Sequence, residues 1–146
     1  MIVNTGIKLM SGKIRVVCCQ VEHWEFVRNL RNHPDVKHGF IQQEEILPAT
    51  HKKYMKQHSR NYWILLKDNA PVGFVGSLEG DIRVAVLPEE CGNGYGKILI
   101  NHVMEQKPYS HAKVKIANDA SLKLFESCGF KKKYYILEKE DETESI

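Results

Sequence analysis

Hydrophobic and polar residues alternate in several short segments of this chain, and a period of two predicts β-strands. The clearest segment is 82–86 (IRVAV), in which three aliphatic residues alternate with an arginine and an alanine. Further apolar or alternating runs predict strands at 14–19, 62–67, 72–78, 112–117 and 133–139, with a weaker pattern at 2–9. Two-residue turns at Asp68-Asn69 and Gly80-Asp81 predict that the strands between 62 and 86 form an antiparallel meander.

Apolar residues recur elsewhere at the three- and four-residue spacing of an amphipathic helix. This spacing predicts helices at 22–32, at 51–57, from 95 up to Lys107-Pro108, and from about 119 to 128. Thr50 is the predicted N-cap of the second helix, and Asp119 or Ser121 that of the last. Gly129 is the predicted C-cap residue of the last helix, with Phe130 placed for the hydrophobic contact that often follows such a cap.

The resulting order, β-α-α-β-β-β-α-β-α-β, predicts a mixed α/β (α+β) fold. We expect one domain at 1–139, followed by an acidic, disordered tail at 140–146. The sequence contains no apolar run of membrane-spanning length and no signal-type start, so we expect no membrane association and a cytoplasmic location. Its four cysteines lack zinc or disulfide spacing, and no metal site is expected.

Glycines at every second position separate the strand at 82–86 from the helix that begins at Tyr95. Gly92, Gly94 and Gly96 let the backbone approach a ligand closely, and the amides at a helix start attract anions. The Gly-x-Gly-x-Gly spacing excludes the dinucleotide fingerprint, and Ile98 after Gly96-Lys97 excludes a Walker A loop. The net charge of the chain is +3, and because residues 138–146 are acidic, the rest of the chain is more positive still. This charge also favours an anionic ligand.

The glycine turn, the element order and the later segment 118–130 (NDASLKLFESCGF) together resemble the GNAT acetyltransferase superfamily over about residues 13–139. The resemblance implies acetyl-CoA as the acetyl donor, bound between two strands of the sheet that splay apart. It implies that Cys91, Gly92, Asn93, Gly94, Tyr95, Gly96 and Lys97 hold the pyrophosphate. It further implies that the main chain of Val84, Ala85 and Val86 pairs with the pantetheine arm, which Asn118, Ser121, Leu124 and Phe125 line on its other side.

The sequence departs from the family pattern at three places. Cys91 stands where relatives carry arginine or glutamine, so a side-chain contact to the phosphates is missing while the backbone amides remain. Phe125 stands where many relatives have a tyrosine that protonates the leaving thiolate. After Phe130 the chain offers one strand instead of a hairpin, so a second subunit of a homodimer is one source for the far wall of the acceptor site.

An amine acceptor must lose a proton before it can attack a thioester, because an alkylammonium has a pKa of about 10. Asp81 is the first candidate for this base, since it begins the strand at a position where many relatives carry a glutamate, and Glu79 is the second. His51 and His33 are weaker candidates beside the acceptor loop. Arg28 and Arg31 of the first predicted helix can meet an anionic acceptor.

The expected reaction is therefore acetyl transfer from acetyl-CoA to a primary amine by direct attack on the thioester. Segment 27–36 resembles members of the superfamily that acetylate amino-sugar nucleotides or protein N-termini, which leaves the acceptor open. The alternative, motivated by Cys91 and Phe125, is a non-catalytic acyl-CoA-binding regulatory module with the same fold. Nucleic acid is not an expected partner, because the chain lacks an aromatic-rich strand motif for base stacking.

Overall fold

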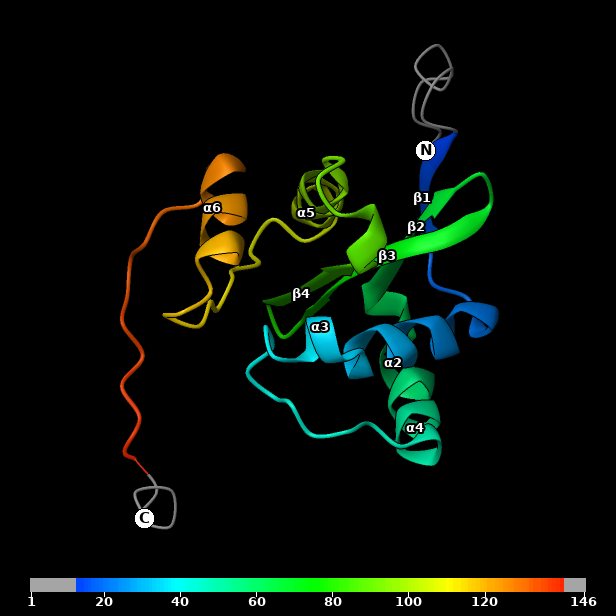
Figure 1. The fold of residues 1–146 in the computed structure, drawn as a ribbon, viewed down its shortest axis with the longest axis horizontal. Helices are drawn as coiled ribbons and strands as arrows, with labels where there is room; N and C mark the ends of the chain where they lie inside the picture. The colour runs from blue at the N-terminus through cyan, green and yellow to red at the C-terminus, as the bar shows by residue number, and fades with distance from the viewer. Residues whose placement is uncertain (1–12, 141–146) are drawn as a thin grey trace.

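A four-stranded antiparallel sheet forms the centre of the computed structural model, which describes residues 13–140 (Figure 1). Its strands lie in the order β1-β2-β3-β4. Their bounds are Ile14–Cys18 for β1, Tyr62–Lys67 for β2, Ala70–Leu78 for β3 and Asp81–Val86 for β4. The predicted meander is therefore confirmed, and the fold belongs to the predicted mixed α/β class. The predicted strand at 2–9 and the tail beyond 140 lie outside the described residues.

Both turns of the meander need residues that tolerate positive φ. Asp68 and Asn69 have φ values of 50° and 71°, and Glu79 and Gly80 have 53° and 83°. Two consecutive left-handed residues match the right-handed twist of the flanking strands. The second turn therefore consists of Glu79 and Gly80 rather than Gly80 and Asp81, and Asp81 is the first residue of β4.

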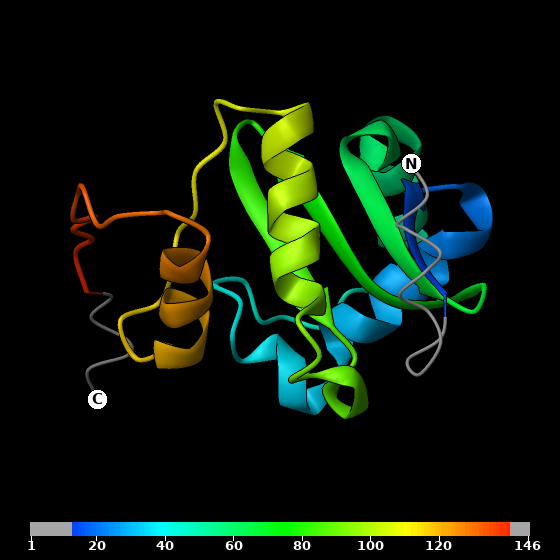
Figure 2. The same cartoon turned by 90° about the horizontal axis from the view of Figure 1, so that it is seen from above.

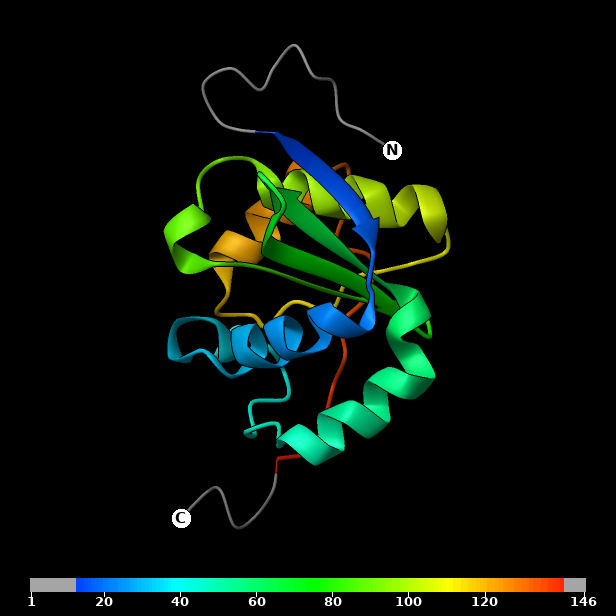
Figure 3. The same ribbon diagram turned by 90° about the vertical axis from the view of Figure 1, so that its right-hand side faces the viewer.

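Helices cover both faces of the sheet, as Figure 3 shows. One face packs against α5 (Tyr95–Gln106) and carries the larger core, which includes Trp63 and Leu65 of β2. The other face packs against α2 (Trp24–Asn32) and α4 (Pro48–His58), where Tyr62, Ile64 and Leu66 of the same strand are buried. Burial on both sides explains why 62–66 is a continuous apolar run.

Short helical segments complete this layer and the approach to α5. They are η2 (Val21–His23), α3 (Pro34–Lys37), η3 (Ser59–Asn61) and η4 (Pro88–Glu90). The helix α4 begins at Pro48 with Leu47 as its N-cap, so the expectation of Thr50 as the cap was wrong. Proline suits the first helical turn because its fixed φ is helical and its missing N–H has no partner there.

The last helix, α6 (Asp119–Ser127), lies beside the first turn of α5 (Figure 2). Its N-cap is Asn118, whose side chain accepts a hydrogen bond from the Ser121 amide at 3.1 Å, instead of Asp119 or Ser121 as predicted. The predicted C-cap is confirmed. Gly129 has a φ of 93°, and the Phe130 amide donates to the Phe125 carbonyl at 3.1 Å. The two rings pack edge to face at 5.1 Å, which completes a Schellman motif.

The predicted strands at 112–117 and 133–139 do not form. One parallel bridge joins His111 to Asp81, and the chain then leaves β4 towards α6. The alternation corresponds to a partly buried face only at its start, where Ala112 and Val114 pack against the core, whereas Ile116 is 99% exposed. Segment 131–140 runs along the outer side of α6, away from the sheet, and is exposed throughout (Figures 1 and 2). A strand needs a partner edge, and neither segment meets one in the described chain.

Candidate active site

The glycine turn before α5 presents free backbone amides to solvent. Gly94, the N-cap of α5, has a φ of 82°, and Gly92 has a φ of 87°. A Cβ at either glycine would meet nothing within 4 Å, so the space above the turn is open. Within residues 13–140, the six amides from Gly92 to Lys97 donate to no acceptor. Together with the positive end of the α5 dipole, they form an arrangement that can bind a phosphate.

Gly96 has a second role, in packing. A Cβ on Gly96 would lie 2.9 Å from Cδ2 of Leu124, so the absence of a side chain lets α6 approach the first turn of α5. Two other side chains of the turn are engaged within the protein and are not free to contact a ligand. Tyr95 is buried in the core, and the Asn93 side-chain amide donates to the Glu90 carbonyl at 3.1 Å. Cys91 and Lys97 are exposed.

The outer edge of β4 is paired only at its beginning. The Ile82 amide donates to the His111 carbonyl at 2.9 Å, and the His111 amide donates to the Gly80 carbonyl at 2.7 Å. A buried hydroxyl pair, Ser77 with Ser110 at 2.6 Å, fixes the incoming chain against β3. Beyond this point the main chain of 84–86 has no neighbouring strand on its outer side in the described residues. The resemblance assigns the pantetheine arm to this edge, although the strand expected on its other side, 112–117, does not form.

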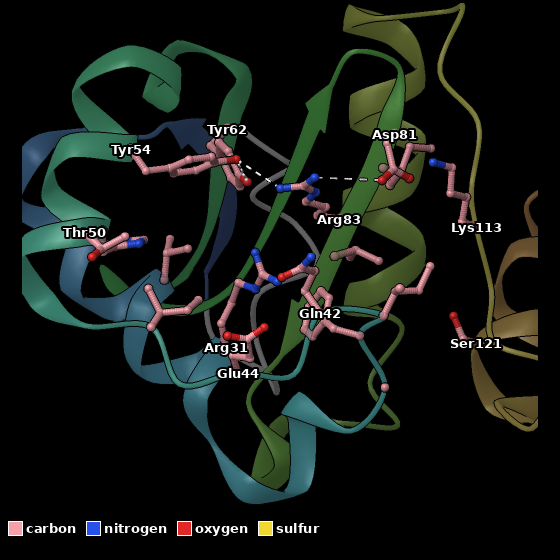
Figure 4. A pocket seen from close by; sticks show the side chains of 18 of the residues that line it. Arg31, Gln42, Glu44, Thr50, Tyr54, Tyr62, Asp81, Arg83, Lys113 and Ser121 are labelled. Carbon is pink, nitrogen blue, oxygen red and sulfur yellow. Dashed lines mark hydrogen bonds and ion pairs between the residues drawn. The ribbon is translucent and has the colours of Figure 1, made fainter. Parts of the chain in front are cut away.

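A cavity of about 470 Å³ extends from this edge of β4 beneath the loop 39–46. Its walls come from α2, α4, β4, α6 and that loop (Figure 4). Of the predicted site residues, it brings together Asp81, Val84, Ser121 and Phe125, together with the weaker candidates His51 and Arg31. Asn118 instead caps α6, and Leu124 packs on Gly96. Glu79 is exposed in the hairpin turn and does not line the cavity.

Loop 39–46 is held over the cavity by side chains of α2. The Asn32 side chain forms two hydrogen bonds with the backbone of Ile46, at 2.8 and 2.9 Å. Arg28 donates to the Ile46 carbonyl at 3.1 Å and is paired with Glu25 at 2.8 Å. Arg28 therefore anchors the loop from outside the cavity, whereas Arg31 lines it.

Asp81 shares the cavity wall with Arg83, two residues along β4 (Figure 4). Arg83 Nη2 lies 3.9 Å from Asp81 Oδ2, and Nη1 donates to the Tyr54 hydroxyl at 3.2 Å. That hydroxyl is 2.7 Å from the hydroxyl of Tyr62. Burial raises the pKa of Tyr54 well above its ordinary value, so its phenol is neutral at physiological pH.

The two histidine candidates for a base have structural contacts. His51 is buried, and its Nε2 donates to the Trp24 carbonyl at 2.8 Å. Burial lowers the pKa of His51 below its ordinary value. His33 caps α3 by accepting a hydrogen bond from the Asp35 amide at 3.0 Å.

Sequence reasoning missed several residues that line the cavity, namely Gln42, Glu44, Thr50 as a wall residue, Tyr54, Arg83 and Lys113. Arg83 carried a usable sequence pattern, because residues i and i+2 of a strand face the same side and Asp81 was already a candidate. The others come from α4, the loop and segment 112–117, whose positions relative to β4 no local pattern encodes.

The model of the acetyltransferase (GNAT) family matches residues 24–130. The chain belongs to the GNAT acetyltransferase family. This GNAT protein matches no curated protein in sequence.

Solved structures of acetyltransferases share the fold of this GNAT chain. An aminoglycoside N-acetyltransferase in complex with CoA has a TM-score of 0.70 at 16% identity, over 92% of this chain and 98% of its own. A spermidine N-acetyltransferase from Vibrio cholerae, with CoA and spermine, has a TM-score of 0.72 at 17% identity, over 86% and 85%. A ribosomal-protein-alanine N-acetyltransferase from Brucella melitensis has a TM-score of 0.68 at 17% identity, over 80% and 84%.

The family assignment confirms the resemblance, the acyltransferase class and acetyl-CoA as the acetyl donor. The glycine turn and the open edge of β4 are compatible with that donor, because they offer free amides to a pyrophosphate and an unpaired strand to an amide-bearing arm. Between residues 13 and 140, no helix is long and apolar enough to cross a membrane. In the same range, no cluster of three metal-ligating side chains occurs.

Proposed function

We propose that this protein transfers the acetyl group of acetyl-CoA to a primary amine that enters the cavity beneath loop 39–46. The amine belongs to a small molecule, such as an amino sugar, or to a protein N-terminus. The observation that carries the proposal is the set of six unpaired amides from Gly92 to Lys97, which lies at one end of the open edge of β4. The donor pyrophosphate binds these amides, and the pantetheine arm pairs with 84–86.

Asp81 is the proposed base. Its carboxylate lies on the cavity wall at the first residue of β4, and its side chain is 24% exposed. A partly exposed carboxylate can accept the ammonium proton directly or through one water molecule. Glu79 remains the alternative base, but its exposed position in the turn makes it less suitable.

The proposed enzyme has no side-chain acid at Phe125. The Phe125 ring is buried between the core and Phe130. The thiol of CoA has a pKa of about 8.5, below the value of about 10 for an alkylammonium, so the thiolate leaves without a positioned acid and takes its proton from solvent. Proton removal from the amine is consequently the more demanding step at neutral pH.

The decisive test measures release of free CoA thiol from acetyl-CoA with a panel of primary amines. Amine-dependent release supports the transferase, and CoA binding without release for any amine favours the regulatory module.

Gly94→Val tests the donor site, because a branched side chain at a φ of 82° is strained and fills the space above the amides. We expect CoA affinity to be lost in a folded variant, and Lys52→Gln, at an exposed position of α4 outside the turn and the cavity, is the control. Unchanged CoA affinity in folded Gly94→Val contradicts the site.

We further propose a homodimer, a cytoplasmic location and a catalytic unit spanning 1–139. The dimer is suggested by segment 134–137 (YYIL), whose four large apolar side chains are all exposed. Such a run is typical of a surface that a partner covers. The cytoplasmic location is suggested by four cysteines that are all free. Light scattering of the wild type and of a variant with Tyr135 and Leu137 changed to Ser tests the dimer, and a wild-type monomer contradicts it.

A further inference from the structure

Arg31 places an unpaired guanidinium in the wall of the cavity. Its Nε is fully buried and has no hydrogen-bond partner. No ion pair or side-chain hydrogen bond of Arg31 occurs with any other described residue. Its guanidinium instead lies over the ring of Phe40, with Cζ 4.5 Å from the ring centroid. The ring holds the guanidinium plane in place without neutralising its charge.

This arrangement is unusual for an arginine that is half-buried and has a fully buried Nε. Buried charges in proteins are normally paired, because desolvation costs several kcal/mol per ion. Arg28, one turn earlier on α2, follows the rule through Glu25. For Arg31, burial lowers the pKa from its ordinary value, and the like charge of Arg83 acts in the same direction. An arginine nevertheless remains protonated in proteins, so a positive charge stays in the cavity without a counter-ion.

The other charged groups of the cavity do not compensate Arg31. Arg83 is the second guanidinium, and its nearest carboxylate is Asp81 at 3.9 Å. Lys113 adds a third cation from the opposite wall (Figure 4). Glu44, on the exposed part of the loop, is the remaining carboxylate, and no ion pair within 4.0 Å joins it to Arg31. His51 adds no positive charge near neutral pH, because burial lowers its pKa.

We infer that the acceptor is a small amine that carries a carboxylate or a phosphate group, and that Arg31 binds this oxyanion while the amine faces Asp81. The inference rests on the proposed function and names its substrate class. A planar guanidinium matches two oxygens of either anion, which gives orientation as well as charge. The cavity of about 470 Å³ also has to admit the acetyl end of the donor, so the amine is comparable in size to an amino acid.

The same arrangement disfavours polycationic acceptors. A polyamine or an aminoglycoside would bring further positive charge against two guanidiniums and Lys113 in a partly buried site, where like charges repel strongly. The structural likeness to a spermidine and an aminoglycoside acetyltransferase therefore does not extend to the acceptor of this chain.

The experiment compares amines of matched size in the thiol-release assay: β-alanine with propylamine, and phosphoethanolamine with ethanolamine, plus putrescine as the cation. We expect kcat/KM to be at least about tenfold higher for the anionic member of one pair, the usual scale of a charged hydrogen bond. The pair that shows the difference distinguishes carboxylate from phosphate. Preference for putrescine or for both neutral amines overturns the inference and leaves the transferase intact.

Variants locate the effect at Arg31. Arg31→Gln should lower kcat/KM for the preferred anionic amine at least about tenfold, mainly through KM, and leave its neutral partner unchanged. Arg60→Gln, at an exposed position outside the cavity, is the matched control. An equal loss for both members of the pair in Arg31→Gln indicates a structural role and overturns the inference. Glu44→Gln should not weaken the anionic amine, since it removes a competing carboxylate.

A binding measurement separates the inference from the proposed function. Calorimetry of β-alanine and phosphoethanolamine with the wild-type protein in the presence of CoA requires no turnover. Binding that is lost in Arg31→Gln supports the oxyanion site even if no amine is acetylated. Absence of binding for both compounds overturns it.

Discussion

The ring of Tyr62 lies over Gly76, its partner across the β2–β3 ladder. A Cβ on Gly76 would lie 2.5 Å from Cε2 of that ring. The ring is buried, and its hydroxyl is 2.7 Å from the hydroxyl of Tyr54, which accepts a hydrogen bond from Arg83. The missing side chain at Gly76 of β3 therefore helps to position Arg83 of β4, through the hydroxyls of Tyr62 and Tyr54.

Gly76→Ala is expected to destabilise the protein by about 1–3 kcal/mol, because the added methyl group displaces a buried ring that has no free space. Chemical denaturation monitored by circular dichroism measures this free energy of unfolding. Tyr62→Phe is the companion variant, since it keeps the ring and removes the hydroxyl. It should cost less stability than Gly76→Ala, and the opposite order would mean that the ring can shift freely.

Asp81→Asn is expected to lower kcat by about 10²-fold or more, the usual scale of a general base, with CoA affinity nearly intact. The amide has the shape of the carboxylate but cannot take a proton from the amine at neutral pH. Steady-state kinetics with a saturating amine and calorimetry with CoA measure the two quantities. Glu79→Gln, two residues away in the exposed turn, should leave kcat unchanged. If Glu79→Gln is the slow variant instead, Glu79 is the base.

Phe125 yields a paired prediction. Phe125→Ala should cost about 3–5 kcal/mol of stability, because the ring is 5% exposed and packs on Phe130. Phe125→Tyr should change turnover by less than about tenfold, or 1.4 kcal/mol of barrier, if no side-chain acid is required. Thermal denaturation and steady-state kinetics measure the two effects. A rise in kcat of several orders of magnitude in Phe125→Tyr would show that the chemistry lacks an acid and would favour the regulatory module.

The buried histidine His51 predicts a loss of stability in mild acid. Its pKa is lowered by burial, so on acidification the unfolded chain binds a proton before the folded protein does. The free energy of unfolding should therefore fall as the pH drops below the ordinary histidine pKa of about 6.5. His102, also lowered by burial, acts in the same direction.

Urea denaturation between about pH 7.5 and pH 5.5 tests the effect, and His51→Gln should make the pH dependence shallower. His38→Gln, at an exposed position, is the control. An identical slope in wild type and His51→Gln would exclude His51 as a cause.

Local sequence patterns predicted the part of the fold whose interactions are local. The meander followed from apolar runs separated by two-residue turns, and the donor loop from Gly92 and Gly94, where positive φ is required. The N-cap of α6 was missed by one residue, because Asn118 and Asp119 are adjacent and both residue types suit the N-cap position.

Patterns that depend on distant partners were less informative. Alternation at 112–117 and 133–139 is real in the sequence, but the chain leaves the free edge of β4 after His111, and neither segment pairs with that edge. The cavity was also beyond local reasoning. Arg31 lies on α2, Tyr54 on α4 and Arg83 on β4, and only the packing of both helices on one face of the sheet brings them together.

After His111 the chain leaves the edge of β4, and this lowers the local stability of the segment that follows. From His111 to residue 140, Phe125 is the only residue that is buried, at 5% exposure. This part of the chain, about a fifth of its length, is therefore held mainly by the bridge to Asp81, by the hydrogen bond from Lys115 to the His38 carbonyl and by the contact of α6 with α5, and it should be the first part to open in native-state fluctuations. A donor bound between β4 and α6 would add contacts to both sides. The affinity for acetyl-CoA and the local stability of α6 are then two measures of one coupled equilibrium.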